Sequence, residues 1–72
     1  GQTESTEQVQ RLEVALEQLL PDERALILLF YWKEKTIEEL VSITGLTASN
    51  IKVKLHRIRK KLFVLLNEMD HE

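Results

Sequence analysis

The fold is decided by residues 36–62, which read TIEELVSITGLTASNIKVKLHRIRKKL. Thr36 is followed three residues later by Glu39, which is the spacing of a capping box at the start of a helix. Apolar residues then recur at helical spacing as far as Gly45, which favours the end of a helix. The stretch therefore predicts a short helix at 37–44.

A second helix follows after three residues. Thr47 is a good helix cap, and no Gly or Pro interrupts the chain from there to about residue 67. A short helix, a three-residue turn that contains Gly45 and a second helix are typical of a helix-turn-helix. Glycine suits a turn position with positive φ, so Gly45→Val is expected to destabilise the domain by roughly 1 kcal/mol or more. The turn pattern alone does not distinguish a DNA-binding domain from another helical hairpin.

Two further helices precede this pair. The first is predicted at 6–20 from apolar residues at three- and four-residue spacing, and the second at 22–33, directly after Pro21. No stretch alternates with a period of two, so the predicted fold class is all-α, with four helices and the helix at 48–67 as the last. The predicted core contains Leu16, Leu29, Leu40, Ile51, Leu55 and Ile58.

Length and composition limit the architecture to one domain. A chain of 72 residues cannot divide its core in two, and there is no cysteine for a disulfide or a zinc site. The longest apolar run, 25–32, is far too short to cross a bilayer, and no signal peptide is recognisable. We expect a domain at 6–68, a C-terminal tail at 69–72 and a disordered N-terminal tail at 1–5. The start Gly-Gln without Met is typical of a tag remnant.

The net charge of −2 conceals a strongly basic block. Residues 48–62 contain six Lys and Arg and no Asp or Glu, whereas acids outnumber bases before and after this block. Such a stripe is typical of nucleic-acid binding, although charge alone also fits a solvated helix face.

A helical wheel separates the roles of residues in this block. With 100° per residue from Ile51, the residues Leu55, Ile58 and Leu62 fall within about 40° of it and form a core face. We call the opposite side the outer face; it contains Ser49, Lys52, Val53, His56, Arg57 and Lys60. Lys54, Arg59 and Lys61 lie on the flanks. This arrangement suits a recognition helix, with long donors over base edges and lysines near phosphates.

The sequence resembles that of a known protein family. Three parts carry the resemblance: Leu20-Pro21 with Arg24 after it, residues 36–45, and the run GLTASNIKVKLHRIRKKL at 45–62. Together they look like region 4 of a bacterial sigma factor, of the extracytoplasmic-function type. The resemblance extends over residues 8–66.

The resemblance implies promoter recognition in the bacterial cytoplasm. Region 4 of that family binds the −35 element and the flap of the RNA polymerase β subunit, while a separate region 2 melts the −10 element and is absent here. It implies a monomer, with an anti-sigma factor as a further partner. It also implies base contacts from Lys52, Val53, His56 and Arg57, and backbone contacts from Thr36, Thr47, Ser49, Lys54, Lys60 and Lys61. Val41, Thr44 and Val53 depart from the family's usual residues.

Two other interpretations remain open. The output domain of two-component or quorum regulators has a similar four-helix scaffold and commonly dimerises through its last helix, although Leu20-Pro21 and the basic final helix favour a sigma factor. A helical protein-interaction module is the other, because the helix at 22–33 is apolar on nearly every side, which also fits a buried central helix.

Catalysis is not indicated by any cluster of residues. His56 lies among cations, His71 is near the end of the chain, and the adjacent Glu38 and Glu39 point in different directions on a helix. We therefore predict no enzyme activity, no cofactor and no metal site.

Overall fold

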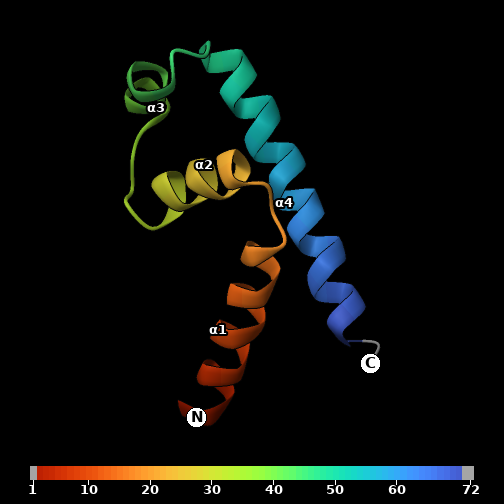
Figure 1. The fold of residues 1–72 in the computed structure, drawn as a ribbon. Helices are drawn as coiled ribbons and strands as arrows, with labels where there is room; N and C mark the ends of the chain where they lie inside the picture. The colour runs from red at the N-terminus through yellow and green to blue at the C-terminus, as the bar shows by residue number, and fades with distance from the viewer. Residues whose placement is uncertain (1, 71–72) are drawn as a thin grey trace.

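A computed structural model describes the backbone of residues 2–70 and the side chains of residues 7–69. This part of the chain contains four helices and no strand, so the predicted all-α class is confirmed. In chain order the helices are α1 (Gln2–Glu17), α2 (Pro21–Tyr31), α3 (Ile37–Thr44) and α4 (Ala48–Asp70). Figure 1 shows α4 as a long diagonal rod, with α3 near its start, α2 against its middle and α1 beside its second half.

The outer helices begin and end at different residues from those predicted. α1 already includes residues 2–5, and α4 continues through residues 69–70, where the sequence analysis expected tails. Gly1 and residues 71–72 lie outside the described part. Gln, Glu and Met are good helix formers, so a helix can continue after its apolar periodicity has faded.

α1 also ends earlier than predicted, at Glu17 instead of Leu20. Two tight backbone hydrogen bonds, from the Gln18 and Leu19 N–H groups to carbonyls three residues earlier, form its last turn. Leu20 is extended, with φ −62° and ψ 150°. A proline disfavours the helical conformation in the residue before it, so Pro21 keeps Leu20 out of α1.

The core lies where α4 meets the other three helices. Of the six residues predicted for it, Leu16, Leu40, Ile51, Leu55 and Ile58 are buried, whereas Leu29 is only half-buried. α2 contributes Leu26 and Ile27 instead, because it packs against α3 and α4 at once and turns that edge inward. The buried cluster as a whole comprises Ala15, Leu16, Leu19, Leu26, Ile27, Leu40, Ile51, Leu55, Ile58 and Leu62.

α2 is partly a central helix and partly a surface. Leu26 and Ile27 are buried in the core, but Tyr31 and Trp32 at its end are 46% and 54% exposed. The apolar character of α2 is therefore explained by burial for Leu26 and Ile27, but not for its exposed end.

The capping interactions around the turn follow the sequence pattern. Glu39 N–H donates to the Thr36 hydroxyl at 3.1 Å, and Thr36 N–H donates to the Glu39 carboxylate at 3.0 Å, which completes the capping box. Gly45 has φ +78°, in the left-handed region that favours glycine. Asn50 N–H donates to the Thr47 hydroxyl at 3.1 Å, so Thr47 caps α4 as predicted.

Thr44 explains one departure from the family pattern. Its hydroxyl donates to the Leu40 carbonyl at 2.7 Å and accepts the Leu46 N–H at 3.1 Å. The hydroxyl therefore links the end of α3 to the turn, a contact that an aliphatic side chain does not make.

Candidate nucleic-acid interface

α4 presents opposite faces of opposite character. Ile51, Leu55 and Ile58 are at most 2% exposed and pack into the core. All six outer-face residues are exposed: Ser49, Lys52, Val53, His56, Arg57 and Lys60. No Asp or Glu occurs on this helix before Glu68. The helix therefore offers hydrogen-bond donors and positive charge to a partner, without a neighbouring acid on the same helix.

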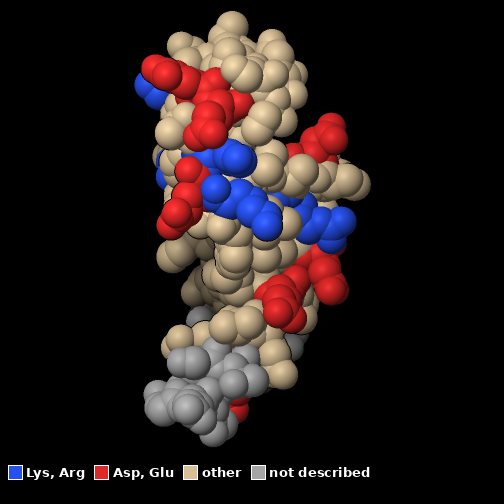
Figure 2. All heavy atoms as spheres, turned by 90° about the vertical axis from the view of Figure 1, so that its left-hand side faces the viewer, with Lys and Arg blue, Asp and Glu red and all other residues tan. Residues whose placement is uncertain are grey.

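The face of the molecule seen in Figure 2 has no such uniform charge. Figure 2 shows the side of the molecule that carries α1, α2 and α3, where acidic groups border the basic ones above and below. Such alternation of sign is typical of a solvated surface. The charge pattern thus distinguishes α4 from the other helices.

One flank of α4 is tied to the start of α2. Lys61 Nζ lies 3.0 Å from Glu23 Oε1, and the same carboxylate oxygen accepts the Leu20 N–H at 2.9 Å. The hydrogen bond from the Leu20 N–H, which has the largest effect, and the one from the Lys61 ammonium hold the pKa of the Glu23 carboxyl below its ordinary value of 4.5. Lys61, which the sequence analysis placed on DNA phosphates, therefore already has an acidic partner.

The other flank is tied to the end of α2. An Arg59 guanidinium nitrogen donates to the Tyr31 hydroxyl at 2.7 Å. Arg59 and Tyr31 are 28 residues apart, and Lys61 and Glu23 are 38 apart. Local spacing in the sequence does not indicate pairs that are so far apart, and neither pair was predicted. The two contacts join the two ends of α2 to the two flanks of α4.

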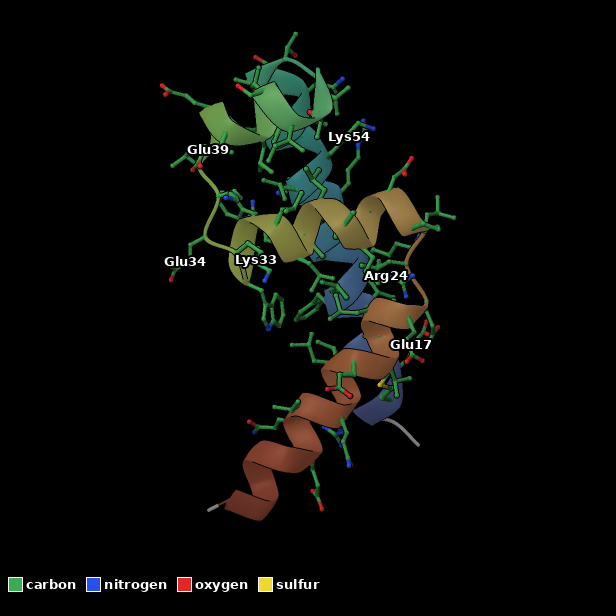
Figure 3. The ribbon with its side chains drawn as sticks, turned by 60° about the vertical axis from the view of Figure 1, so that its left-hand side comes forward. Glu17, Arg24, Lys33, Glu34, Glu39 and Lys54 are labelled. Atoms are coloured by element: carbon green, nitrogen blue, oxygen red, sulfur yellow. The ribbon has the colours of Figure 1, made fainter. Side chains whose placement is uncertain are left out.

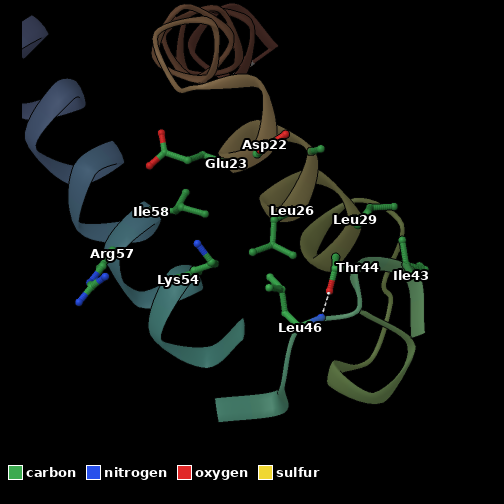
Figure 4. Close-up of a pocket in the computed structure, with 11 residues that line it drawn as sticks. Asp22, Glu23, Leu26, Leu29, Ile43, Thr44, Leu46, Lys54, Arg57 and Ile58 are labelled. Carbon is green, nitrogen blue, oxygen red and sulfur yellow. Dashed lines mark hydrogen bonds between the residues drawn. The ribbon is translucent and has the colours of Figure 1, made fainter. Parts of the chain in front are cut away.

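A groove of about 590 Å³ lies between α2, α3 and α4. Lys54 and Arg57 both line this groove from α4; Figure 4 shows Lys54 on the side of Glu23 and the end of the Arg57 side chain pointing outward. Figure 3 likewise shows Lys54 reaching from α4 toward α2, while Glu34 points outward from the connection after α2. The apolar part of the lining comprises Ala25, Leu26, Leu29, Ile43, Leu46 and Ile58. No single stretch of the sequence indicates this groove, because its walls come from three separate helices.

Hydroxyl groups lie at the starts of α3 and α4. Thr36 and Thr47 are exposed N-cap residues, and Ser49 is exposed in the first turn of α4. The Thr47 hydroxyl accepts a hydrogen bond from the helix, so its O–H hydrogen remains able to donate to a phosphate oxygen. These positions suit contacts to a nucleic-acid backbone.

The end of α4 is only partly covered by the other helices. Phe63 and Val64 are 71% and 52% exposed, whereas Leu65 and Leu66 are half-buried. α1 covers one side of α4 and leaves the other to solvent. A shallow depression of about 360 Å³ is lined there by His56, Arg59, Lys60, Phe63 and Val64.

Fold and surface together define a helix-turn-helix domain whose last helix carries an exposed basic face. The model of the sigma-70 region 4 family matches residues 9–62, and the chain belongs to this family. No curated protein and no solved structure is similar enough to be matched to it. The family is that of the DNA-binding domain of sigma factors, which interacts with promoter DNA and RNA polymerase in transcription initiation and is not a catalytic domain. It favours the sigma interpretation over a response-regulator output domain.

Two features of the described residues bear on other classes of function. None of their helices is long and apolar enough to cross a membrane. The same part of the chain contains no group of three or more His, Cys, Asp or Glu side chains placed to hold a metal ion.

Proposed function

We propose that this domain binds the −35 promoter element as region 4 of an extracytoplasmic-function sigma factor, in the bacterial cytoplasm. One observation carries the proposal: the exposed face of α4 directly after the helix-turn-helix turn has donors and cations but no acid. The major groove of B-DNA is about 12 Å wide and admits one α-helix. The first half of α4 enters it with the outer face toward the bases.

The residues divide by the part of DNA that they contact. Arg57 and Lys52 donate to guanine O6 and N7, which is the commonest specific contact in the major groove. His56 and Val53 face base edges beside them. The DNA backbone is contacted by the hydroxyl groups and the remaining cations, which are Thr36, Thr47, Ser49, Lys54, Lys60 and Lys61. Lys61 contributes least of these, since Glu23 already occupies its ammonium group.

RNA polymerase is the second partner. The flap of its β subunit contacts the apolar wall that α2 and α3 contribute to the groove, whereas Lys54 and Arg57 border the same groove from α4. An anti-sigma factor is a further partner of the intact protein. The isolated domain is a monomer, because one sigma factor serves one promoter.

The proposal is tested by a titration with DNA at several salt concentrations. The DNA is a duplex selected from a random library, with a scrambled duplex of the same composition as control. Arg57→Ala is expected to cost about 1–3 kcal/mol on the selected duplex and little on the scrambled one, because only the former offers the guanine. Lys60→Ala is expected to weaken both alike and to lower the salt slope by about 1.

The affinity of this domain alone is expected to be poor. One helix without a second half-site or polymerase binds near the non-specific range, roughly 10⁻⁴ to 10⁻⁶ M. Identical behaviour of the two variants on both duplexes would contradict the division between base and phosphate contacts. Retention of binding when the whole outer face is neutralised would contradict the proposed interface itself.

A further inference from the structure

Val53 has no packing role that explains an apolar residue at its position. It is 46% exposed, it is outside the buried cluster, and it is not among the apolar residues that pack against that cluster. A β-branched residue also lowers helix propensity slightly, so the helix itself gains nothing from valine here. The side chain is therefore available to a partner of α4.

The surroundings of Val53 are entirely polar. On a helix its neighbours lie three and four residues away in both directions, and here they are Ser49, Asn50, His56 and Arg57. Val53 is the only apolar member of the outer face. A partner that covers this face must therefore offer one small apolar group among hydrogen-bonding groups.

DNA offers one such group in the major groove, the 5-methyl group of thymine. Opposite cytosine or adenine the valine would cover an amino group without replacing its hydrogen bond to water, which is unfavourable. We infer that Val53 contacts the 5-methyl group of a thymine and selects for thymine at one position of the site. The inference rests on the proposed function and adds to it the base that this residue specifies.

The helix geometry also places this thymine relative to guanine. Arg57 is four residues after Val53, about 6 Å further along the helix axis. Base pairs are spaced about 3.4 Å apart, so this distance corresponds to roughly two steps. The thymine lies within about two base pairs of the guanine that Arg57 contacts.

The test removes the methyl group from the DNA. In the selected duplex each thymine is replaced in turn by deoxyuridine, which pairs identically but lacks the methyl group. We expect one position at which the wild-type chain loses affinity about fourfold, the value for burial of one methyl group. Val53→Ala is expected to bind the thymine and deoxyuridine duplexes equally at that position.

Val64→Ala is the matched control, because Val64 is a valine of similar exposure, 52%, on the same helix but beyond the outer face. It is expected to retain the deoxyuridine penalty of the wild type. Both valines are exposed and alanine is the better helix former, so both variants should fold, which circular dichroism verifies.

Three outcomes overturn the inference: no position is sensitive to deoxyuridine, the penalty persists in Val53→Ala, or the selected site has no thymine near the guanine. In each of these the chain still selects a sequence, so the proposed function stands. Failure of the library to yield any preferred duplex would instead refute the proposed function, and the inference with it.

Discussion

Gly45 shows how a single residue can be required by the backbone alone. Its φ is +78°, and a Cβ atom built on it would meet nothing within 4 Å. The space around it would accept a side chain, but the left-handed conformation would not. The need for glycine comes from the chain direction at the turn and not from close packing.

The first prediction concerns substitution of this glycine. Gly45→Val is expected to lower the free energy of unfolding by roughly 1 kcal/mol or more, because valine is strained in the left-handed backbone conformation. Gly45→Asn is the control, because asparagine tolerates positive φ better than other residues. Urea denaturation measures both. Equal losses in the two variants would show that the cost arises from something other than backbone conformation.

A second prediction at the residue scale concerns acid stability. The hydrogen bond from the Thr36 N–H, which has the largest effect, and the one from the Thr36 hydroxyl hold the pKa of the Glu39 carboxyl below its ordinary value of 4.5. The pKa of the Glu23 carboxyl is also lowered. A lowered pKa in the folded state stabilises the fold above the unfolded pKa, and this contribution is lost as pH falls through the folded pKa. We expect stability to decline below about pH 4.5.

The measurement is the melting temperature as a function of pH. The double variant Glu23→Gln, Glu39→Gln is expected to be less stable than the wild type at neutral pH and to lose less stability on acidification, since glutamine does not titrate. If both proteins lost the same amount of stability between neutral pH and about pH 3, these two carboxylates would not be the source.

At the scale of elements, α2 holds α4 at two points. Glu23 pairs with Lys61 at the start of α2, and Tyr31 accepts a hydrogen bond from Arg59 at its end. Exposed ion pairs contribute little to stability, so the main consequence is for charge available to DNA. The acid of α2 neutralises a cation beside the outer face of α4.

Removal of that acid is therefore expected to strengthen DNA binding. Glu23→Gln frees Lys61 for a phosphate and keeps an amide oxygen that can accept the Leu20 N–H. We predict a higher affinity for any duplex and a salt slope steeper by up to about 1. Glu13→Gln, the same change of charge on α1, is the control for net charge alone. A gain of equal size in the control would rule out a local effect of Glu23.

The elements themselves follow from local patterns, but their docking does not. The caps Thr36 and Thr47 depend on residues three positions away, and both were predicted correctly. The half-buried state of Leu29 and the exposure of Phe63 were not predicted, because each depends on which neighbouring helix covers that side of the residue's own helix. Periodicity identifies an apolar face, whereas the partner of that face is set by the angle between helices.

For the whole molecule, the arrangement of surfaces bears on oligomeric state. The extents of the molecule are 38 × 23 × 16 Å, and α4 extends along most of the longest axis. The exposed apolar residues Phe63 and Val64 form a small patch beside cations on one side of α4. Such a patch is too small for the interface of a stable dimer, which buries about 800 Å² per partner.

We therefore predict a monomer in solution, which sedimentation equilibrium measures. Phe63→Ser is the control and is expected to leave the molecular mass unchanged. A concentration-dependent dimer that Phe63→Ser abolishes would show that the end of α4 is a self-association surface, as in the output domains of response regulators.

Local sequence was enough to predict four helices, the caps of α3 and α4, the glycine at the turn and the acid-free outer face of α4. Each of these features depends on residues within about one helical turn of each other, so it can be predicted from a short stretch of sequence. The pairs Glu23–Lys61 and Arg59–Tyr31, the groove between three helices and the exposure of Phe63 arise only in the tertiary structure. They join residues far apart in the chain, and their formation depends on how the packed helices cross, which no local spacing specifies.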